Sequence, residues 1–288
     1  MQKNICFVVP TFPPHYLYAC DFQESFKKYG YDKQADLYYI FTTPAERDGF
    51  LPCNSIVLPQ SLRILKNRGI INIKKFYGLM RLKNQYEYII TLDDDCRFCN
   101  YIDLQKLCAD YFSNKILYGN ILENPPWDMM GTIVKSCKSF FDNKYEPKLN
   151  CPLYLWFNQL PIYKTSTLND FFKITNIGRK LPILTYYDFD YYVYMFYLIL
   201  RHEFQTQDIG IIADRAASEI FLSSHYKIAS TINKNAFFIS TRYMRNHFNL
   251  ENVIIEIHLD RENVIHKTNK MKRTFAALKL INRIRKIL

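Results

Sequence analysis

The chain has 288 residues, 49% of them hydrophobic and 23% charged, which is typical of a folded globular protein and excludes a disordered chain. The formal net charge is +11, but residues 267–288 carry eight Lys or Arg and no Asp or Glu, so this tail accounts for +8 of the +11. The nearly neutral remainder argues against a nucleic-acid groove across the fold and favours a separate basic appendage.

The eight cysteines do not indicate a disulfide framework. The first residues, M-Q-K-N-I-C-F-V-V-P, lack the apolar core and cleavage site of a signal peptide, so we expect reduced cysteines in the cytosol. Cys96 and Cys99 form one C-x-x-C without a second, which favours packing over zinc binding. The longest apolar run, residues 189–200, contains Asp190 and has the length of a core helix, so no membrane span is predicted.

Strands and helices are predicted to alternate through the first part of the chain. Apolar runs that end at proline or turn residues predict strands, and apolar residues at helical spacing predict helices. In chain order we expect a strand over 4–12, a helix over 19–29, strands over 35–43 and 55–58, a helix over 70–83, a strand over 86–92 and a helix over 100–113. This alternation predicts an α/β fold with a Rossmann-like, mainly parallel sheet flanked by helices.

The most informative segment is Y-E-Y-I-I-T-L-D-D-D-C-R, residues 86–97, in which an apolar strand runs into three aspartates. Ligands gather at the carboxyl ends of parallel strands, which is where these aspartates would lie. Adjacent carboxylates repel one another, and a bound cation relieves that repulsion. Carboxylate oxygens suit Mg²⁺ or Mn²⁺, which bind substrate phosphates as well as protein. A solvated polar turn is the simpler interpretation, but the strand before it favours a site for a diphosphate substrate.

The spacing of the three aspartates predicts different partners for them. In an extended segment Asp93 and Asp95 point to one side and Asp94 to the other. We therefore expect one pair to share a metal and a ribose, while the middle residue is held by the backbone or by a basic neighbour such as Arg97.

After about residue 114 the sequence becomes rich in Pro, Trp, Tyr and Phe. It contains no repeat and no flexible linker, which predicts one domain with an aromatic second half. No G-x-G-x-x-G, P-loop, G-x-S-x-G or H-E-x-x-H motif is present, so a diphosphate would be held chiefly through its metal.

This layout resembles that of GT-A glycosyltransferases, and more loosely the small enzymes that build bacterial capsule or lipopolysaccharide chains. The likeness covers residues 4–260 in layout, and its specific parts are T-L-D-D-D and the opening V-V-P-T-F. It implies that Pro10, Thr11 and Phe12 hold the nucleotide base, although a plain strand end explains them equally well. It also implies that Mn²⁺ or Mg²⁺ binds at Asp93 and Asp95, or at Asp94 and Asp95 in another register. The resemblance further implies that Asp93 and Asp94 contact the nucleotide.

The resemblance also implies a general base at the start of a helix that lines the acceptor site. The segment Y-Y-D-F-D-Y-Y offers Asp188 and Asp190, one of which would cap the helix while the other removes the acceptor proton, with a slight preference for Asp188 as the base. No E-D dipeptide occurs in this region and no H-x-x-G-x-x-K-P-W motif occurs in the chain, so inverting stereochemistry is favoured only weakly.

Aromatic faces beside amides suit sugars, although aromatic residues are also common in protein cores. The candidates for sugar or acceptor contacts are Trp127, Trp156, Asn158, Gln159 and Tyr187. His258, in the alternating I-I-E-I-H-L, is the candidate third metal ligand, with a structural strand histidine as the alternative.

From Lys270 onward, apolar residues recur every three or four positions with basic residues between them. This pattern predicts an amphipathic helix that lies on an anionic membrane, the alternative being a helix docked on its own domain or on a second subunit.

Together these features predict a metal-dependent glycosyltransferase that moves a sugar from a nucleoside diphosphate donor, UDP first among them, to a glycan or lipid-linked glycan. A metal-dependent nucleotidyltransferase or phosphotransferase is the alternative, and a membrane- or RNA-binding protein without enzyme activity is a third. We expect one catalytic domain over 1–266, with a nucleotide-binding half over 1–113 and an acceptor half over 114–266, and a membrane helix over 267–288. The protein would lie in the cytoplasm, on the inner face of the cytoplasmic membrane.

Overall fold

The computed structural model describes most of the predicted catalytic domain and little of the chain beyond residue 208. The described residues are 3–63, 69–98, 101–119, 129–149, 160–208, 220–223, 227–231 and 254–258. The predicted membrane helix over 267–288 therefore lies outside them.

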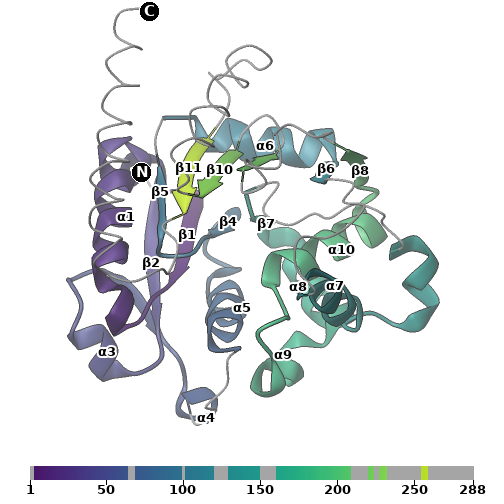
Figure 1. Ribbon diagram of the computed structural model, residues 1–288, viewed down its shortest axis with the longest axis horizontal. Coiled ribbons are helices and arrows are strands. Elements are labelled where there is room, and N and C mark those ends of the chain that lie inside the picture. The colour runs from purple at the N-terminus through teal and green to yellow at the C-terminus, as the bar shows by residue number, and fades with distance from the viewer. Residues whose placement is uncertain are drawn as a thin grey trace, which may run out of the picture.

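A five-stranded sheet in the order β3-β2-β1-β4-β7 forms the centre of the fold (Figure 1). Its strands are β1 (Ile5–Pro10), β2 (Ala35–Phe41), β3 (Asn54–Val57), β4 (Tyr88–Thr91) and β7 (Ile162–Lys164). The first four strands are parallel, and β7 runs antiparallel to β4. Every residue of β1 is buried, which fits its central position. The sheet confirms the expected α/β class with a mainly parallel sheet, and its strand order is compatible with a Rossmann-like fold.

Two helices of 13 residues cover opposite faces of β1: α1 (Tyr16–Lys28) and α5 (Ile70–Leu82). Phe26 of α1 packs edge-on against Phe7, with ring centroids 5.2 Å apart. The next residue, Val8, lies against Gly78 of α5. Neighbouring residues of a strand point to opposite faces, so the two helices sandwich the sheet. α5 thereby reaches the same end of the sheet as the residues that follow β1 and β4.

Gly78 lets α5 approach the sheet closely, and we expect Gly78→Ala to lower the free energy of unfolding by about 1–3 kcal/mol. A Cβ at this position would lie 2.6 Å from Val8 Cγ1 and 3.3 Å from Ile40 Cδ1, both in the packed sheet. Urea unfolding measures the effect. The matched control is Gly131→Ala in α7 (Met129–Lys138), where a Cβ would meet no atom of the described residues within 4 Å and alanine's helix propensity should stabilise by about 0.5–1 kcal/mol. Equal effects in the two variants would contradict tight packing at Gly78.

The second half of the chain packs beside β7 and contributes α7 (Met129–Lys138), α8 (Thr165–Thr175) and α10 (Asp190–His202) (Figure 1). Residues 190–198 of α10 are all buried, and most of them are aromatic. Residues 185–188, just before α10, are joined to α5, because the Asn72 amide donates to the carbonyls of Thr185 (2.9 Å) and Tyr186 (3.1 Å). The aromatic helix α10 therefore forms part of the core next to the sheet.

Smaller elements complete the described fold. A four-stranded sheet has the order β5-β11-β10-β9, and a two-stranded sheet joins β6 and β8. The remaining bounds are η1 (Pro13–His15), α2 (Tyr31–Gln34), α3 (Pro44–Asp48), α4 (Gln60–Arg63), β5 (Cys96–Phe98), α6 (Leu104–Asn114), β6 (Ile116–Gly119), η2 (Asn143–Leu149), α9 (Ile177–Lys180), η3 (Leu181–Ile183), β8 (Gln205–Asp208), β9 (Ile220–Ser223), β10 (Lys227–Thr231) and β11 (Ile254–His258).

The predicted strands and helices of residues 4–113 are all present, with shifted ends. α1 begins at Tyr16 instead of residue 19, because the short helix η1 leads directly into it. The helix expected over 100–113 is α6, which begins later because Asp103 is its N-cap and accepts a hydrogen bond from the Lys106 amide at 3.0 Å. Over the residues that the structure describes, none of the helices combines the length and the apolar character that a membrane crossing needs.

Candidate functional site

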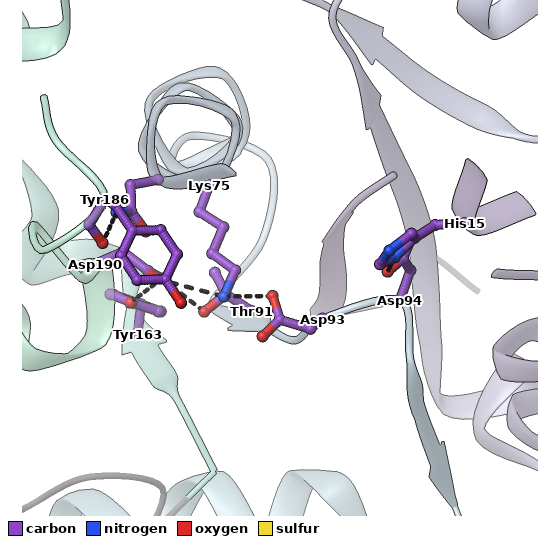
Figure 2. Close-up of polar contacts among 9 residues, drawn as sticks. His15, Lys75, Thr91, Asp93, Asp94, Tyr163, Tyr186 and Asp190 are labelled. Atoms are coloured by element: carbon purple, nitrogen blue, oxygen red, sulfur yellow. Dashed lines mark hydrogen bonds and ion pairs between the residues drawn. The ribbon is translucent and has the colours of Figure 1, made fainter. Parts of the chain in front are cut away.

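Two loops meet at the carboxyl edge of the sheet, one after β1 and one after β4. The two strands are neighbours, with Val8 paired to Thr91, and the Leu92 amide donates to the Val8 carbonyl at 3.2 Å. The residues after β1 and the three aspartates after β4 therefore lie side by side, as the sequence predicts. α5 and the start of α10 approach the same place and add charged side chains to it (Figure 2).

Asp93 is paired with a buried lysine that the sequence analysis did not identify. Lys75 of α5 places its Nζ 3.0 Å from Asp93 Oδ1 and 3.8 Å from Asp190 Oδ1, and only 4% of its side chain is exposed. Burial lowers the pKa of Lys75, but the charges of Asp93 and Asp190 outweigh burial and the net pKa is raised. Lys75 is therefore an ammonium that lies between two carboxylates (Figure 2).

Asp190 is completely buried at the start of α10. Its Oδ2 accepts hydrogen bonds from the hydroxyls of Thr91 (2.7 Å) and Tyr163 (2.6 Å), which come from β4 and β7. Its Oδ1 forms no hydrogen bond within the described part of the chain and faces Lys75. Asp190 therefore links two strands of the sheet to α5 and α10. Its side chain is 0% exposed, so a substrate cannot contact it in this state.

Asp94 points away from Asp93, as predicted (Figure 2). The extended conformation expected for this segment is wrong, because it forms a turn in which the Cys96 amide donates to the Asp93 carbonyl at 3.3 Å. The side chain of Arg97, the expected partner, lies outside the described residues. Asp94 Oδ1 lies 2.9 Å from Nδ1 of His15, in the loop after β1. Its Oδ2 and the Thr11 hydroxyl are buried, and neither forms a hydrogen bond among the described residues. Burial raises the pKa of Asp94, an effect that His15 and the nearby Thr11 hydroxyl oppose. Asp94 therefore ties the β4 loop to the β1 loop.

A second buried lysine, Lys74, lies at the same edge. Its Nζ donates to the Thr11 carbonyl at 2.6 Å and lies 3.7 Å from Glu46 Oε2. Glu46 belongs to α3 and also accepts a hydrogen bond from the Thr42 amide at 2.7 Å. Burial lowers the pKa of Lys74 to about 8, against the raising effects of Glu46 and Asp94. The ammonium of Lys74 is thus costly to bury at neutral pH.

We expect this cost to appear in the pH dependence of stability. Because the folded-state pKa of Lys74 is about 8 and an exposed lysine titrates near 10.4, the unfolded state binds more protons between these values. Stability therefore rises with pH across this window. Relative to Lys74→Met, which cannot titrate, the wild type should gain roughly 2 kcal/mol between pH 7.5 and 9.5. Urea unfolding of both proteins at each pH measures the gain, and a difference that does not change with pH would contradict the lowered pKa.

Asp188 is engaged in the turn before α10. Its Oδ1 accepts from the Ser136 hydroxyl at 2.5 Å, and its Oδ2 accepts from the Thr185 amide and hydroxyl at 2.6 and 2.9 Å. The predicted cap is wrong, because the N-cap of α10 is Phe189 and no side chain caps this end. The reason is the turn itself, whose amide and hydroxyl take the Asp188 oxygens before the helix begins. Both base candidates are thus buried and bonded in this state.

The other predicted residues are only partly covered by the described chain. Pro10 ends β1, and Thr11 and Phe12 follow it beside the aspartates. The Phe12 ring lies tilted by 31° against that of His15, with 4.2 Å between the ring centroids. Tyr187 is 37% exposed, close to α10. His258 ends β11, as the strand pattern predicts, and its backbone pairs with Cys96, the residue after Asp95. Four candidates lie outside the described residues, namely Trp127, Trp156, Asn158 and Gln159.

The sequence analysis missed the basic residues of this site. Lys74 and Lys75 are buried inside a helix whose neighbours are mostly apolar, Ile73 and Phe76 among them. Two lysines on the apolar side of a predicted helix are a usable signal, because a buried ammonium needs a carboxylate partner. His15 carried no such signal, because only the adjacent strands bring it to Asp94.

The described residues fit a dication that is shared with a substrate, and not one held by protein alone. No group of three or more His, Cys, Asp or Glu side chains that could hold a metal ion occurs in the described ranges. Mg²⁺ and Mn²⁺ commonly bind through one or two carboxylates plus substrate phosphates and water. Asp93 and Asp95 are both partly exposed and supply hard oxygen ligands of this kind.

No protein-family model matches the chain, and a search of curated proteins finds no significant match. The function must therefore be argued from the residues themselves.

Proposed function

We propose that this protein is a metal-dependent glycosyltransferase of the GT-A type, which transfers a sugar from a nucleoside diphosphate donor, with UDP-sugars the first candidates, to a glycan of the bacterial surface. One observation carries the proposal. Three consecutive aspartates follow a parallel strand at the carboxyl edge of the sheet, with Asp93 and Asp95 partly exposed and Asp94 buried against His15. This division favours Asp93 and Asp95 over Asp94 and Asp95 as the dication ligands.

The roles follow from the chemistry of a diphosphate leaving group. Asp93 and Asp95 would bind Mn²⁺ or Mg²⁺, which when bound offsets the negative charge of the departing nucleoside diphosphate. The loop of Pro10, Thr11 and Phe12 would lie along the nucleotide, because it runs beside the aspartates and is fixed by the hydrogen bond from Lys74 to the Thr11 carbonyl. Asp188 and Asp190 line the start of α10, and either must lose a present partner to act as the base in an inverting reaction.

The experiment is a donor panel. The full-length protein is incubated with a set of nucleotide sugars in Mn²⁺ or in chelator, and slow hydrolysis is followed by the products. Metal-dependent release of a nucleoside diphosphate from one donor is the expected result and also identifies the sugar. Release of pyrophosphate from a nucleoside triphosphate would instead favour the nucleotidyltransferase alternative. Absence of any metal-dependent turnover or binding across the panel would refute both.

A lipid-linked acceptor and attachment to the inner face of the cytoplasmic membrane are proposed from the basic, amphipathic pattern of residues 267–288. We expect a variant without these residues to lose co-sedimentation with anionic vesicles while donor hydrolysis persists. Vesicles of neutral lipid are the control, because each basic residue near an anionic surface contributes about 1 kcal/mol. Unchanged co-sedimentation would assign the tail to the domain or to a second subunit.

A further inference from the structure

Lys75 lies closer to one of its two carboxylate partners than to the other. Its Nζ is 3.0 Å from Asp93 Oδ1, within hydrogen-bond distance, and 3.8 Å from Asp190 Oδ1, just beyond it. The side chain of Asp93 is 31% exposed, whereas that of Asp190 is 0% exposed. The ammonium is therefore closest to the carboxylate that a ligand can reach, and farther from the one that no ligand can reach.

Asp190 is held in place with one acceptor unused. Thr91 and Tyr163 fix its Oδ2, while its Oδ1 is buried and has no hydrogen bond in the described structure. A buried carboxylate oxygen without a donor is costly. The donor closest to satisfying it is Lys75, whose long, flexible side chain needs to move by only about 1 Å to reach the usual distance of a charge-assisted hydrogen bond.

A dication at Asp93 would change the balance between the two pairs. A divalent ion and the Lys75 ammonium compete for the same Asp93 carboxylate. Lys75 is buried, so it cannot remain charged without a carboxylate partner when Asp93 is taken. Asp190 offers that partner without any movement of the backbone.

We propose that Lys75 is a counter-ion switch, which pairs with Asp93 when no dication is bound and moves to Asp190 Oδ1 when a dication binds Asp93. Asp190 is then a positioning residue, which acts on the dication through Lys75 and not by contact with substrate. This inference rests on the dication site of the proposed function, and it assigns to Asp190 a role other than that of general base.

The test compares Asp190→Asn and Lys75→Met/Asp190→Asn with the wild type by their Mn²⁺ affinity, measured from the electron paramagnetic resonance signal of free Mn²⁺, first with Mn²⁺ alone and then with added UDP. In Asp190→Asn, Asp93 is the one carboxylate left beside Lys75 among the described residues, so Mn²⁺ affinity should fall about 10–100-fold, the usual effect of losing a partner in the outer shell of a metal site. In Lys75→Met/Asp190→Asn no ammonium competes, so affinity should return to the wild-type value or exceed it. Rescue by removal of Lys75 distinguishes the switch from a merely structural role.

Tyr163→Phe is the matched control, because it removes one donor to Asp190 and leaves its charge; its Mn²⁺ affinity should change less than about threefold, far below the outer-shell effect. Unchanged affinity in Asp190→Asn, or affinity in the double variant at least tenfold below wild type, would overturn the switch. If Asp190→Asn fails to fold, the double variant still tests the switch, because an Mn²⁺ affinity at least tenfold below that of the wild type would overturn it. A wild type that binds no Mn²⁺ under either condition would refute the dication site of the proposed function, and the switch with it.

Discussion

Replacing Lys75 by methionine is expected to lower the free energy of unfolding by about 3–5 kcal/mol, the usual cost of removing one partner of a buried ion pair. The loss leaves Asp190, which is 0% exposed, without its ammonium and with two hydroxyls as its remaining described partners. Methionine is unbranched and only one heavy atom shorter than lysine, so little of the effect comes from lost packing. Urea unfolding followed by circular dichroism measures it.

Two variants make this result specific. Lys75→Met/Asp190→Asn removes both buried charges and should recover most of the stability, because replacing a whole buried pair is often nearly neutral. Lys144→Met breaks an exposed pair between Lys144 and Asp142, whose side chains are 64% and 59% exposed, and should leave the stability nearly unchanged. If Lys75→Met were as mild as Lys144→Met, the buried ammonium would not be a main anchor between the sheet and α10.

Replacing Asp93 by asparagine is expected to reduce sugar transfer by about a thousandfold or more, because the bound dication supplies several kcal/mol of stabilisation to the departing diphosphate. The fold should survive, since the Asn amide oxygen still accepts from Lys75 and Asp190 remains beside it. We expect a loss of stability of only about 1 kcal/mol. Turnover of the donor found in the panel measures activity, and urea unfolding measures stability.

Parallel variants of the neighbouring aspartates identify which pair binds the dication. Asp95→Asn should lose as much transfer as Asp93→Asn. Asp94→Asn should retain Mn²⁺ binding, because Asp94 is turned toward His15 and is only 6% exposed. Loss of Mn²⁺ binding in Asp94→Asn with retention in Asp93→Asn would move the site to Asp94 and Asp95. Full activity in both Asp93→Asn and Asp95→Asn would refute the metal-dependent function.

The fold of the first 113 residues was largely predictable, because its elements differ in period and end at recognisable residues. The helix over 70–83 and the strand over 86–92 were placed within two residues of α5 and β4. β7 was not predicted, since its three residues, 162–164, are too few to show alternation. It pairs with β4 only because the chain returns to the sheet in the antiparallel direction.

The strand-to-aspartate junction was predictable from the sequence, because an apolar run that ends in charged residues is a local pattern. The opposite directions of Asp93 and Asp94 were expected from an extended chain, but they arise in a turn closed by the hydrogen bond from the Cys96 amide to the Asp93 carbonyl. Tertiary structure decided the partners of those carboxylates. His15 is 79 positions from Asp94 (94 − 15), and Lys75 is 18 positions from Asp93 (93 − 75). Asp190, the second carboxylate beside Lys75, is 115 positions from that lysine (190 − 75). Pairing across strands and packing of α5 and α10 bring them together, and a buried charge accepts only the partner that the fold places within reach.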